Sequence, residues 1–250
     1  MNSVKTILTV FIFSLISTSV ISQTAKEIIT KMDEKLRGES SRAEITMTIV
    51  RPSWQRSVSM KTWSKGTEYS MIYITSPARD EGSAYLKRDN EIWNWVPNIG
   101  RTVKLPPSMM MQSWLGSDFT NDDLVRESSV IKDYTHRFGA DSTVNGYDSY
   151  QIVLKPKPDA PVVWGELKIW VTKDEYIQLK TEFYDEDGYL INLMEATDLK
   201  DFDGRLLPSK LTMTPIEEPG NQTILEYKFM RFNENIRDSF FSVQNMKRVN

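Results

Sequence analysis

Few side chains of this chain could carry out bond-making chemistry. Cysteine is absent and His136 is the only histidine, which excludes thiol catalysis, thiolate metal sites and the usual histidine clusters that bind zinc. Ser117, Asp118 and His136 could be assembled into a Ser-His-Asp hydrolase, but the G-x-S-x-G turn that presents such a serine is missing. His136 instead falls in a short polar stretch, Tyr134 to Phe138, that is typical of a strand. We therefore expect no catalytic residues and predict that the protein is not an enzyme.

Three neighbouring acidic residues are the next candidates for a site. Asp118, Asp122 and Asp123 could in principle bind calcium, yet their spacing lacks the loop pattern that a calcium site needs. Helix capping explains them better, because Thr120 stands where the N-cap of a short helix would be and the helix dipole favours acids in the first turn. We expect no metal and no other cofactor.

A segment rich in methionine and aromatic residues follows two consecutive prolines, Pro106 and Pro107, and interrupts the pattern around it. Methionine is flexible and polarizable, so clusters of it suit surfaces that adapt to varied apolar ligands. The segment predicts either a plug that completes the core of an open sheet or a lid over a lipid-sized cavity, and the two are compatible. Its candidate binding residues are Met109, Met110, Met111, Trp114, Leu115 and Phe119.

The elements that must position this segment are mainly strands. Thr24 to Arg37 predicts one amphipathic helix, with Thr24 and Glu27 at capping-box spacing and Gly38 at its end. After it, apolar and polar residues alternate with period two, as in strands with one buried face. We count about eleven strands, separated by turn signals such as Asn145-Gly146, Asp187-Gly188 and Asp203-Gly204.

Short connections between so many strands predict a mainly β domain made of one antiparallel meander over residues 23–250. A meander of this length must close, split or curl. We expect an unclosed, strongly curved β-barrel, with the N-terminal helix and a short helical lid covering its concave face. A closed outer-membrane barrel fits less well, because the outward faces of the strands are too charged.

The first 22 residues read as a cleavable signal peptide. Lys5 precedes an apolar stretch from Ile7 to Ile16, and Val20 and Ser22 provide the small residues before a cleavage site after Ser22. The stretch is too short to span a bilayer, so we predict an exported protein that does not span the membrane. Of 31 basic and 34 acidic residues, cleavage removes only Lys5 and leaves a net charge of −4. This mild acidity argues against a nucleic-acid partner.

Several ordered motifs resemble the LolA-like outer-membrane lipoprotein-sorting proteins. They are W-S-K-G at Trp63 to Gly66, S-P-A-R-D-E-G-S-A-Y-L at Ser76 to Leu86, E-I-W-N-W-V-P-N-I-G-R-T-V-K-L at Glu91 to Leu105, S-W-L-G-S-D-F-T-N-D-D-L at Ser113 to Leu124 and W-V-T-K-D at Trp170 to Asp174. Their order and spacing carry the resemblance across most of the chain. It implies a periplasmic protein with an unclosed barrel whose helices cover the open side and whose apolar interior accepts acyl chains.

The resemblance implies a carrier or chaperone for protein transport. It would shield the acyl chains of lipoproteins, or of lipids, on their way to the outer membrane, between an inner-membrane transporter and an outer-membrane acceptor. The alternative is a lipid-sensing or accessory protein that works with an inner-membrane lipid exporter. Besides the lid residues, the candidates for lining the cavity are Tyr69, Met71, Tyr85, Leu86, Trp93 and Trp95.

In the best-studied carrier of the family, an arginine on the sheet bonds to the lid and gates ligand entry. Arg56 and Arg101 lie on expected strands, but neither stands in a matching motif. The sequence therefore identifies no gating residue. The Trp93 and Trp95 pair also has a simpler interpretation, packing between neighbouring strands.

Overall fold

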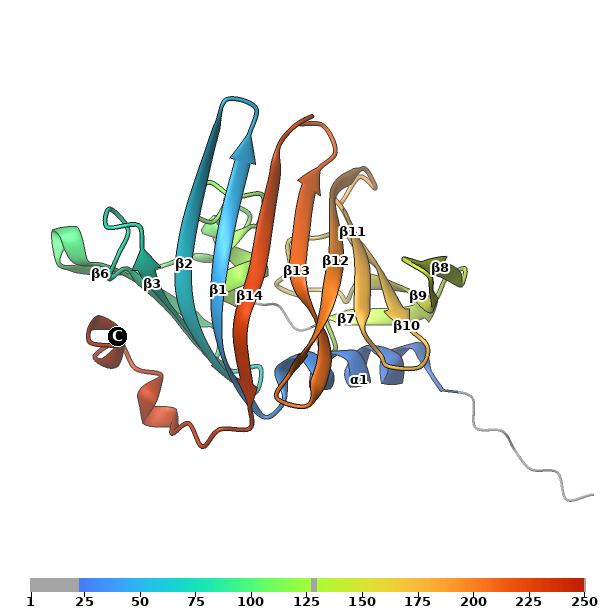
Figure 1. The fold of residues 1–250 in the computed structure, drawn as a ribbon, viewed down its shortest axis with the longest axis horizontal. Coiled ribbons are helices and arrows are strands. Elements are labelled where there is room, and N and C mark those ends of the chain that lie inside the picture. The colour runs from blue at the N-terminus through green and yellow to red at the C-terminus, as the bar shows by residue number, and fades with distance from the viewer. Residues whose placement is uncertain (1–22, 127–129, 250) are drawn as a thin grey trace, which may run out of the picture.

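The computed structural model describes residues 23–126 and 130–249 (Figure 1). The expected signal peptide, residues 1–22 with cleavage after Ser22, lies outside the described residues. One helix is followed by strands that all belong to a single antiparallel sheet of 14 strands. The strands are β1 (Ser40–Arg51), β2 (Trp54–Lys65), β3 (Tyr69–Ser76), β4 (Ala84–Arg88), β5 (Glu91–Val96), β6 (Arg101–Lys104), β7 (Tyr134–Phe138), β8 (Ser142–Val144), β9 (Tyr147–Pro156), β10 (Glu166–Thr172), β11 (Gln178–Tyr184), β12 (Leu190–Phe202), β13 (Arg205–Pro215) and β14 (Gln222–Phe232).

The sheet is open and curved, with β6 at one edge and β7 at the other. Its order is β6-β5-β4-β3-β2-β1-β14-β13-β12-β11-β10-β9-β7, and β8 pairs with β9 outside this series. The first and last strands, β1 and β14, are therefore neighbours in the middle of the sheet. The mainly β, unclosed half-barrel expected from the sequence is confirmed.

The helix α1 (Ala25–Arg37) forms where its capping signals predict it. The Thr24 side chain accepts a hydrogen bond from the Glu27 backbone N–H at 3.2 Å, and the Glu27 carboxylate accepts one from the Thr24 N–H at 2.8 Å. Gly38 ends the helix at φ 63°, a backbone angle that residues with a Cβ rarely adopt. Ile28 and Ile29 are fully buried against the sheet, so the helix covers part of the concave face.

Alternation along the strands gives the sheet two apolar faces. On β1, Ala43, Ile45, Met47 and Ile49 are buried and pack in the same cluster as the α1 side chains, which defines the concave face. The convex face of β3, β4 and β5 is covered by residues 233–249, here called the C-terminal segment. Figure 1 shows this segment outside the sheet beside β2 and β3. It contains two 3-10 turns, η4 (Asp238–Phe240) and η5 (Asn245–Lys247).

The chain crosses from one edge of the sheet to the other between β6 and β7, and residues 105–126 of this crossing are called the lid segment (Figure 1). Its helical content is smaller than expected, consisting of the 3-10 turn η2 (Pro107–Met109) and one π-helical turn, η3 (Asp122–Arg126). A 3-10 turn η1 (Pro97–Ile99) connects β5 to β6. The strand expected at Tyr134 to Phe138 is present as β7, although it stood outside the count of about eleven. The sequence missed β4 and β8, because β4 is buried on both faces and β8 has only three residues.

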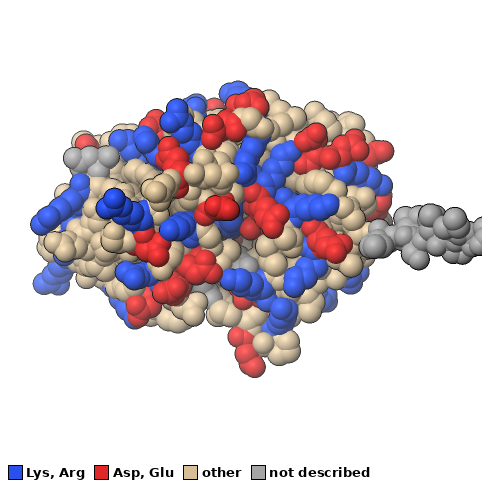
Figure 2. Space-filling model, turned by 90° about the horizontal axis from the view of Figure 1, so that it is seen from below, with Lys and Arg blue, Asp and Glu red and all other residues tan. Residues whose placement is uncertain are grey.

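Figure 2 shows the molecule from below, at the end where α1 lies, with acidic and basic side chains interspersed and no patch of one sign. A mixed surface of this kind differs from the basic stripe of a nucleic-acid-binding face. Within residues 23–126 and 130–249, no helix combines the length and the hydropathy needed to cross a bilayer.

Candidate functional site

An apolar cavity of about 290 Å³ lies between the concave face and the lid segment. Strands from both halves of the sheet contribute to its wall, as does the last turn of α1 through Leu36 and Arg37. The apolar lining includes Ala43, Ile45, Met60, Ile72, Leu167, Phe183, Met194, Leu211, Met213, Leu225 and Met230. The lid segment closes it with Trp114, Phe119 and Leu124. A cavity with this predominantly apolar lining can hold an apolar chain.

Two aromatic side chains fix the lid segment to the concave face. Trp114 is 1% exposed and Phe119 3% exposed, and the Trp114 ring lies edge-on to Tyr85 with the centroids 5.4 Å apart. The backbone between them doubles back, because the Trp114 N–H donates to the Phe119 carbonyl at 2.8 Å and Gly116 has φ 78°. Burying two rings of this size contributes several kcal/mol to holding the lid segment closed.

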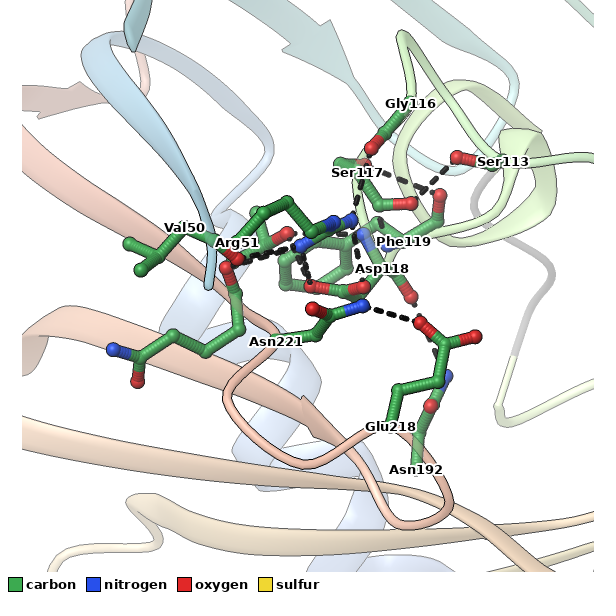
Figure 3. Close-up of polar contacts among 12 residues, drawn as sticks. Val50, Arg51, Ser113, Gly116, Ser117, Asp118, Phe119, Asn192, Glu218 and Asn221 are labelled. Carbon is green, nitrogen blue, oxygen red and sulfur yellow. Dashed lines mark hydrogen bonds and ion pairs between the residues drawn. The ribbon is translucent and has the colours of Figure 1, made fainter. Parts of the chain in front are cut away.

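A buried ion pair joins the lid segment to the middle of the sheet (Figure 3). Arg51, the last residue of β1, donates from Nη2 to Asp118 Oδ1 at 2.9 Å and from Nη1 to Asp118 Oδ2 at 3.1 Å. The side chains are 14% and 6% exposed, respectively. A bidentate arginine–carboxylate pair this well buried is geometrically specific and stronger than an exposed pair.

Further hydrogen bonds fix both partners of this pair. Arg51 Nη2 also donates to the Gly116 carbonyl at 3.0 Å. The Thr223 hydroxyl donates to Asp118 Oδ2 at 2.7 Å and accepts from the Asp118 N–H at 2.9 Å. Asn192 Nδ2 donates to the Asp118 carbonyl at 3.3 Å. Three strands, β1, β12 and β14, therefore hold one residue of the lid segment, and Figure 3 shows them converging on it.

Two carboxylates of the lid segment, Asp122 and Asp123, border the cavity. Its lining also includes the polar side chains of Arg37, Ser41, Thr62, Ser64, Ser70 and Gln178. Asp123 and Thr120 cap the π-helical turn reciprocally, since the Asp123 N–H donates to Thr120 Oγ1 at 3.1 Å and the Thr120 N–H donates to Asp123 Oδ2 at 2.8 Å. This confirms the capping role expected of Thr120. The indole Nε1 of Trp164 donates to Asp123 Oδ1 at 2.9 Å. Burial raises the pKa of Asp123 above the ordinary value of an aspartate.

The predicted lid residues differ in how deeply the structure buries them. Met110 is buried with Trp114 and Phe119 in the concave cluster, where Met109 and Leu115 pack at its border. Met111 points to solvent with 66% of its surface exposed. Of the three methionines, Met111 therefore does not contribute to the closed lid, although its sequence context resembles that of its neighbours.

The predicted wall residues separate onto the two faces of the sheet. Tyr85 belongs to the concave cluster, and burial raises its pKa to about 12. Five others pack in the convex cluster under the C-terminal segment, and four of these do not line the cavity that we expected them to border. The five are Tyr69, Met71, Leu86, Trp93 and Trp95.

Strand register explains this separation. Met71 pairs with Leu86 and Leu86 pairs with Trp93, so their side chains share one face, while Ile72 pairs with Tyr85 on the other. Phe241 stacks on Tyr69 with ring centroids 5.4 Å apart, and Phe240 packs against Trp63 at the same distance. Of the five, only Met71 also borders the cavity.

The residues considered for hydrolysis have other partners. Asp118 is held by Arg51, the Ser117 hydroxyl lies 3.3 Å from the Phe119 carbonyl, and His136 Nε2 lies 2.7 Å from the Val130 carbonyl. No hydrogen bond among the described side chains links His136 to Ser117 or Asp118. Nor do the described parts of the chain contain a group of three or more His, Asp or Glu side chains placed to hold a metal ion.

Sequence reasoning missed Arg51, Asp123 and Trp164 as members of this site. Arg51 and Asp118 are 67 residues apart, and Trp164 and Asp123 are 41 residues apart. Nothing local predicts either contact. The only available signal was that Arg51 precedes Pro52 at the end of a strand, where a side chain is free to reach a crossing segment.

Comparisons with known proteins agree with this architecture. Residues 66–248 match the model of a family described as uncharacterized protein. No curated protein matches the chain. Among solved structures, a LolA superfamily protein from Nitrosomonas europaea is 23% identical, covers 89% of this chain and 99% of its own length, and has a TM-score of 0.77.

Two other solved structures have the same fold. One, from Vibrio parahaemolyticus, is described as an outer membrane lipoprotein-sorting protein domain; it is 22% identical, with 90% and 98% of the two chains covered and a TM-score of 0.80. The other is a DUF1329 family protein from Desulfovibrio piger, also 22% identical, with 89% and 97% covered and a TM-score of 0.80. The resemblance inferred from the motifs is thus confirmed at the level of the fold.

Proposed function

We propose that this chain, which belongs to the uncharacterized protein family matched over residues 66–248 and has the fold of the LolA superfamily, is a carrier for acyl chains. It would shield the acyl chains of lipoproteins or lipids in its concave cavity while they cross the periplasm toward the outer membrane. It would act by binding and release and without catalysis. Its partners would be an inner-membrane transporter that loads it and an outer-membrane acceptor.

The observation that carries this proposal is the largely apolar cavity, closed by a lid segment that a buried ion pair fastens to the sheet. Each methylene removed from water contributes about 0.8 kcal/mol, so even a short chain gains several kcal/mol inside. One water molecule takes up about 30 Å³ in the liquid. A cavity of about 290 Å³ therefore has room for roughly ten groups of the size of a water molecule or a methylene. A full acyl chain therefore requires the lid segment to move outward.

Arg51 is the residue that we propose as the gate. Its guanidinium connects Asp118 and the Gly116 carbonyl of the lid segment to the end of β1. Cargo that displaces Trp114 and Phe119 must break or stretch this connection. The empty carrier would thus stay closed until the acyl chain supplies enough apolar burial to open it.

Filling the cavity tests the proposal directly. Ala43 is 3% exposed and lines the cavity from β1, so Ala43→Phe adds a ring where cargo would lie. Thr48 is on the same strand but outside the concave apolar series, and Thr48→Phe is the matched control. We expect displacement titrations with a fluorescent fatty-acyl probe to show at least tenfold weaker binding for Ala43→Phe and unchanged binding for Thr48→Phe.

Export and cargo can be examined in the same preparation. Native mass spectrometry of protein recovered from a periplasmic extract should show a mature chain beginning after Ser22 with a bound lipid or acylated peptide. Equal probe affinity in both phenylalanine variants, together with a ligand-free mass, would overturn the carrier proposal.

A further inference from the structure

The carboxylate of Asp123 is a polar feature of the cavity that the carrier proposal leaves unexplained, and Asp122 lines the same cavity. Asp123 borders the same cavity as Phe183 and Met194. None of the ion pairs among the described side chains includes Asp123. Asp123 is half-buried, and taking a carboxylate out of water is costly unless hydrogen-bond donors compensate for the lost hydration.

Asp123 has hydrogen-bonding capacity left over. Oδ1 accepts from Trp164 Nε1 and Oδ2 accepts from the Thr120 N–H. Each carboxylate oxygen has two lone pairs, and each therefore has room for one more donor. A donor that entered through the cavity would meet these free positions, because Asp123 lines the cavity wall.

A second polar group at the same cavity is a hydrogen-bond donor, whereas the Asp123 carboxylate is an acceptor. The indole Nε1 of Trp114 is buried beside the Tyr85 hydroxyl, but it makes no hydrogen bond of good geometry with the described residues. Trp114 is 1% exposed and lines the cavity. An indole N–H is only a donor, so a buried one calls for an oxygen acceptor.

We propose, as a refinement that rests on the carrier function, that the cavity selects acyl chains attached through an amide. An amide combines the N–H that Asp123 can accept and the carbonyl oxygen that the Trp114 indole can bind, and it carries no charge. An ester lacks the donor. A fatty carboxylate would add another carboxyl group beside Asp122 and Asp123 in a water-poor space, where like charges repel strongly.

A matched pair of ligands isolates the N–H group. N-methyldodecanamide and methyl dodecanoate have the same chain and nearly the same shape. They differ only in the group between the carbonyl and the methyl, which is N–H in the amide and an oxygen atom in the ester. We expect the wild-type protein to bind the amide at least tenfold more tightly than the ester, measured by displacement of a fluorescent acyl probe. Dodecanoate should bind more weakly than either at pH 7.5. Equal affinities for amide and ester would overturn the inference.

Two variants assign the preference to its residues. Asp123→Asn should reduce the amide-to-ester ratio to within about threefold, because the added amide group competes as a donor. Trp114→Phe should weaken amide and ester by the same factor, since both present a carbonyl. A ratio that stays above tenfold in Asp123→Asn would overturn the inference.

A third variant covers the case in which Asp123→Asn fails to fold. Trp164→Phe frees Asp123 Oδ1 while keeping the charge, so the amide-to-ester ratio should rise above that of the wild type. An unchanged or smaller ratio would refute the role of Asp123. Failure of every ligand to bind, the ester included, would refute the carrier function itself, whereas ester binding without amide preference would refute only this refinement.

Discussion

Breaking the latch between Arg51 and Asp118 is the sharpest perturbation that this structure offers. Arg51→Met keeps most of the aliphatic length of the side chain and removes the guanidinium. It leaves the Asp118 carboxylate with the Thr223 hydroxyl as its remaining side-chain donor, and it removes the bond to the Gly116 carbonyl. At the strand end, Arg51 Nη1 also donates to the Val50 carbonyl at 2.8 Å and to the Gln222 carbonyl at 3.5 Å. The charged partner that loses its ion pair is Asp118, so we expect the larger share of the loss to fall on the lid segment.

The size of the effect follows from burial. Removing one partner of a buried pair costs about 3–5 kcal/mol, and the remaining exposure of 14% and 6% places this pair near the lower figure. About 3 kcal/mol corresponds to a factor of about 100 in an equilibrium constant. If the lid segment opens independently of the sheet, its opening equilibrium should increase by that factor while global stability changes less.

Hydrogen exchange measured by mass spectrometry distinguishes opening of the lid segment from global unfolding. Peptides covering residues 113–124 contain amides that bond within the lid segment, such as Trp114 N–H to the Phe119 carbonyl. Their exchange should accelerate about 100-fold in Arg51→Met. Peptides from β12 (Leu190–Phe202), in the middle of the sheet, provide the internal reference.

A double-mutant cycle provides the control. Asp118→Asn keeps the shape of the side chain and removes its charge, so the Arg51→Met/Asp118→Asn double variant should be less perturbed than the two single effects added together. The reasoning is refuted if residues 113–124 exchange at the wild-type rate in Arg51→Met. It is equally refuted if they accelerate only in step with β12, because the lid segment would then not be a separate opening unit.

Further predictions concern single positions. Met110→Asp should lower the melting temperature and abolish probe uptake because it buries an unpaired carboxylate, whereas Met111→Asp at the exposed neighbour should leave both unchanged. Phe241→Ala should reduce the free energy of unfolding by about 3–5 kcal/mol in denaturant titrations, since Phe241 is fully buried under the convex aromatic cluster. Burial lowers the pKa of His136, so its titration by NMR should give a value below 6.5. Between the folded value and 6.5 the unfolded chain binds more protons, so the free energy of unfolding should fall as pH decreases through this interval, and less so in His136→Gln.

The sequence was sufficient for those features that depend on neighbouring residues. The helix over Ala25–Arg37 follows from a capping box and a terminal glycine, both local signals. The buried series on β1, which includes Met47 and Ile49, follows from period-two alternation. Both were predicted where the structure has them.

The choice between faces could not be predicted in the same way. On β3, the neighbours Met71 and Ile72 are both buried, one under the C-terminal segment and one in the cavity. Alternation separates two faces, but it does not say which face is concave when both are apolar. Contacts such as Arg51 to Asp118 depend on how distant segments meet, and no local pattern records them.

Topology explains why this sheet has a lid. The chain leaves β6 at one edge and must enter β7 at the other, so the connection has to cross a face of the sheet. The C-terminal segment covers part of the convex face, and the concave face receives the crossing. A closed cavity is thus a consequence of strand order, and the tightness of closure depends on a few contacts. The Arg51–Asp118 pair can be weakened without altering a single core residue, which makes it the point where opening of the lid segment can be tuned independently of the fold.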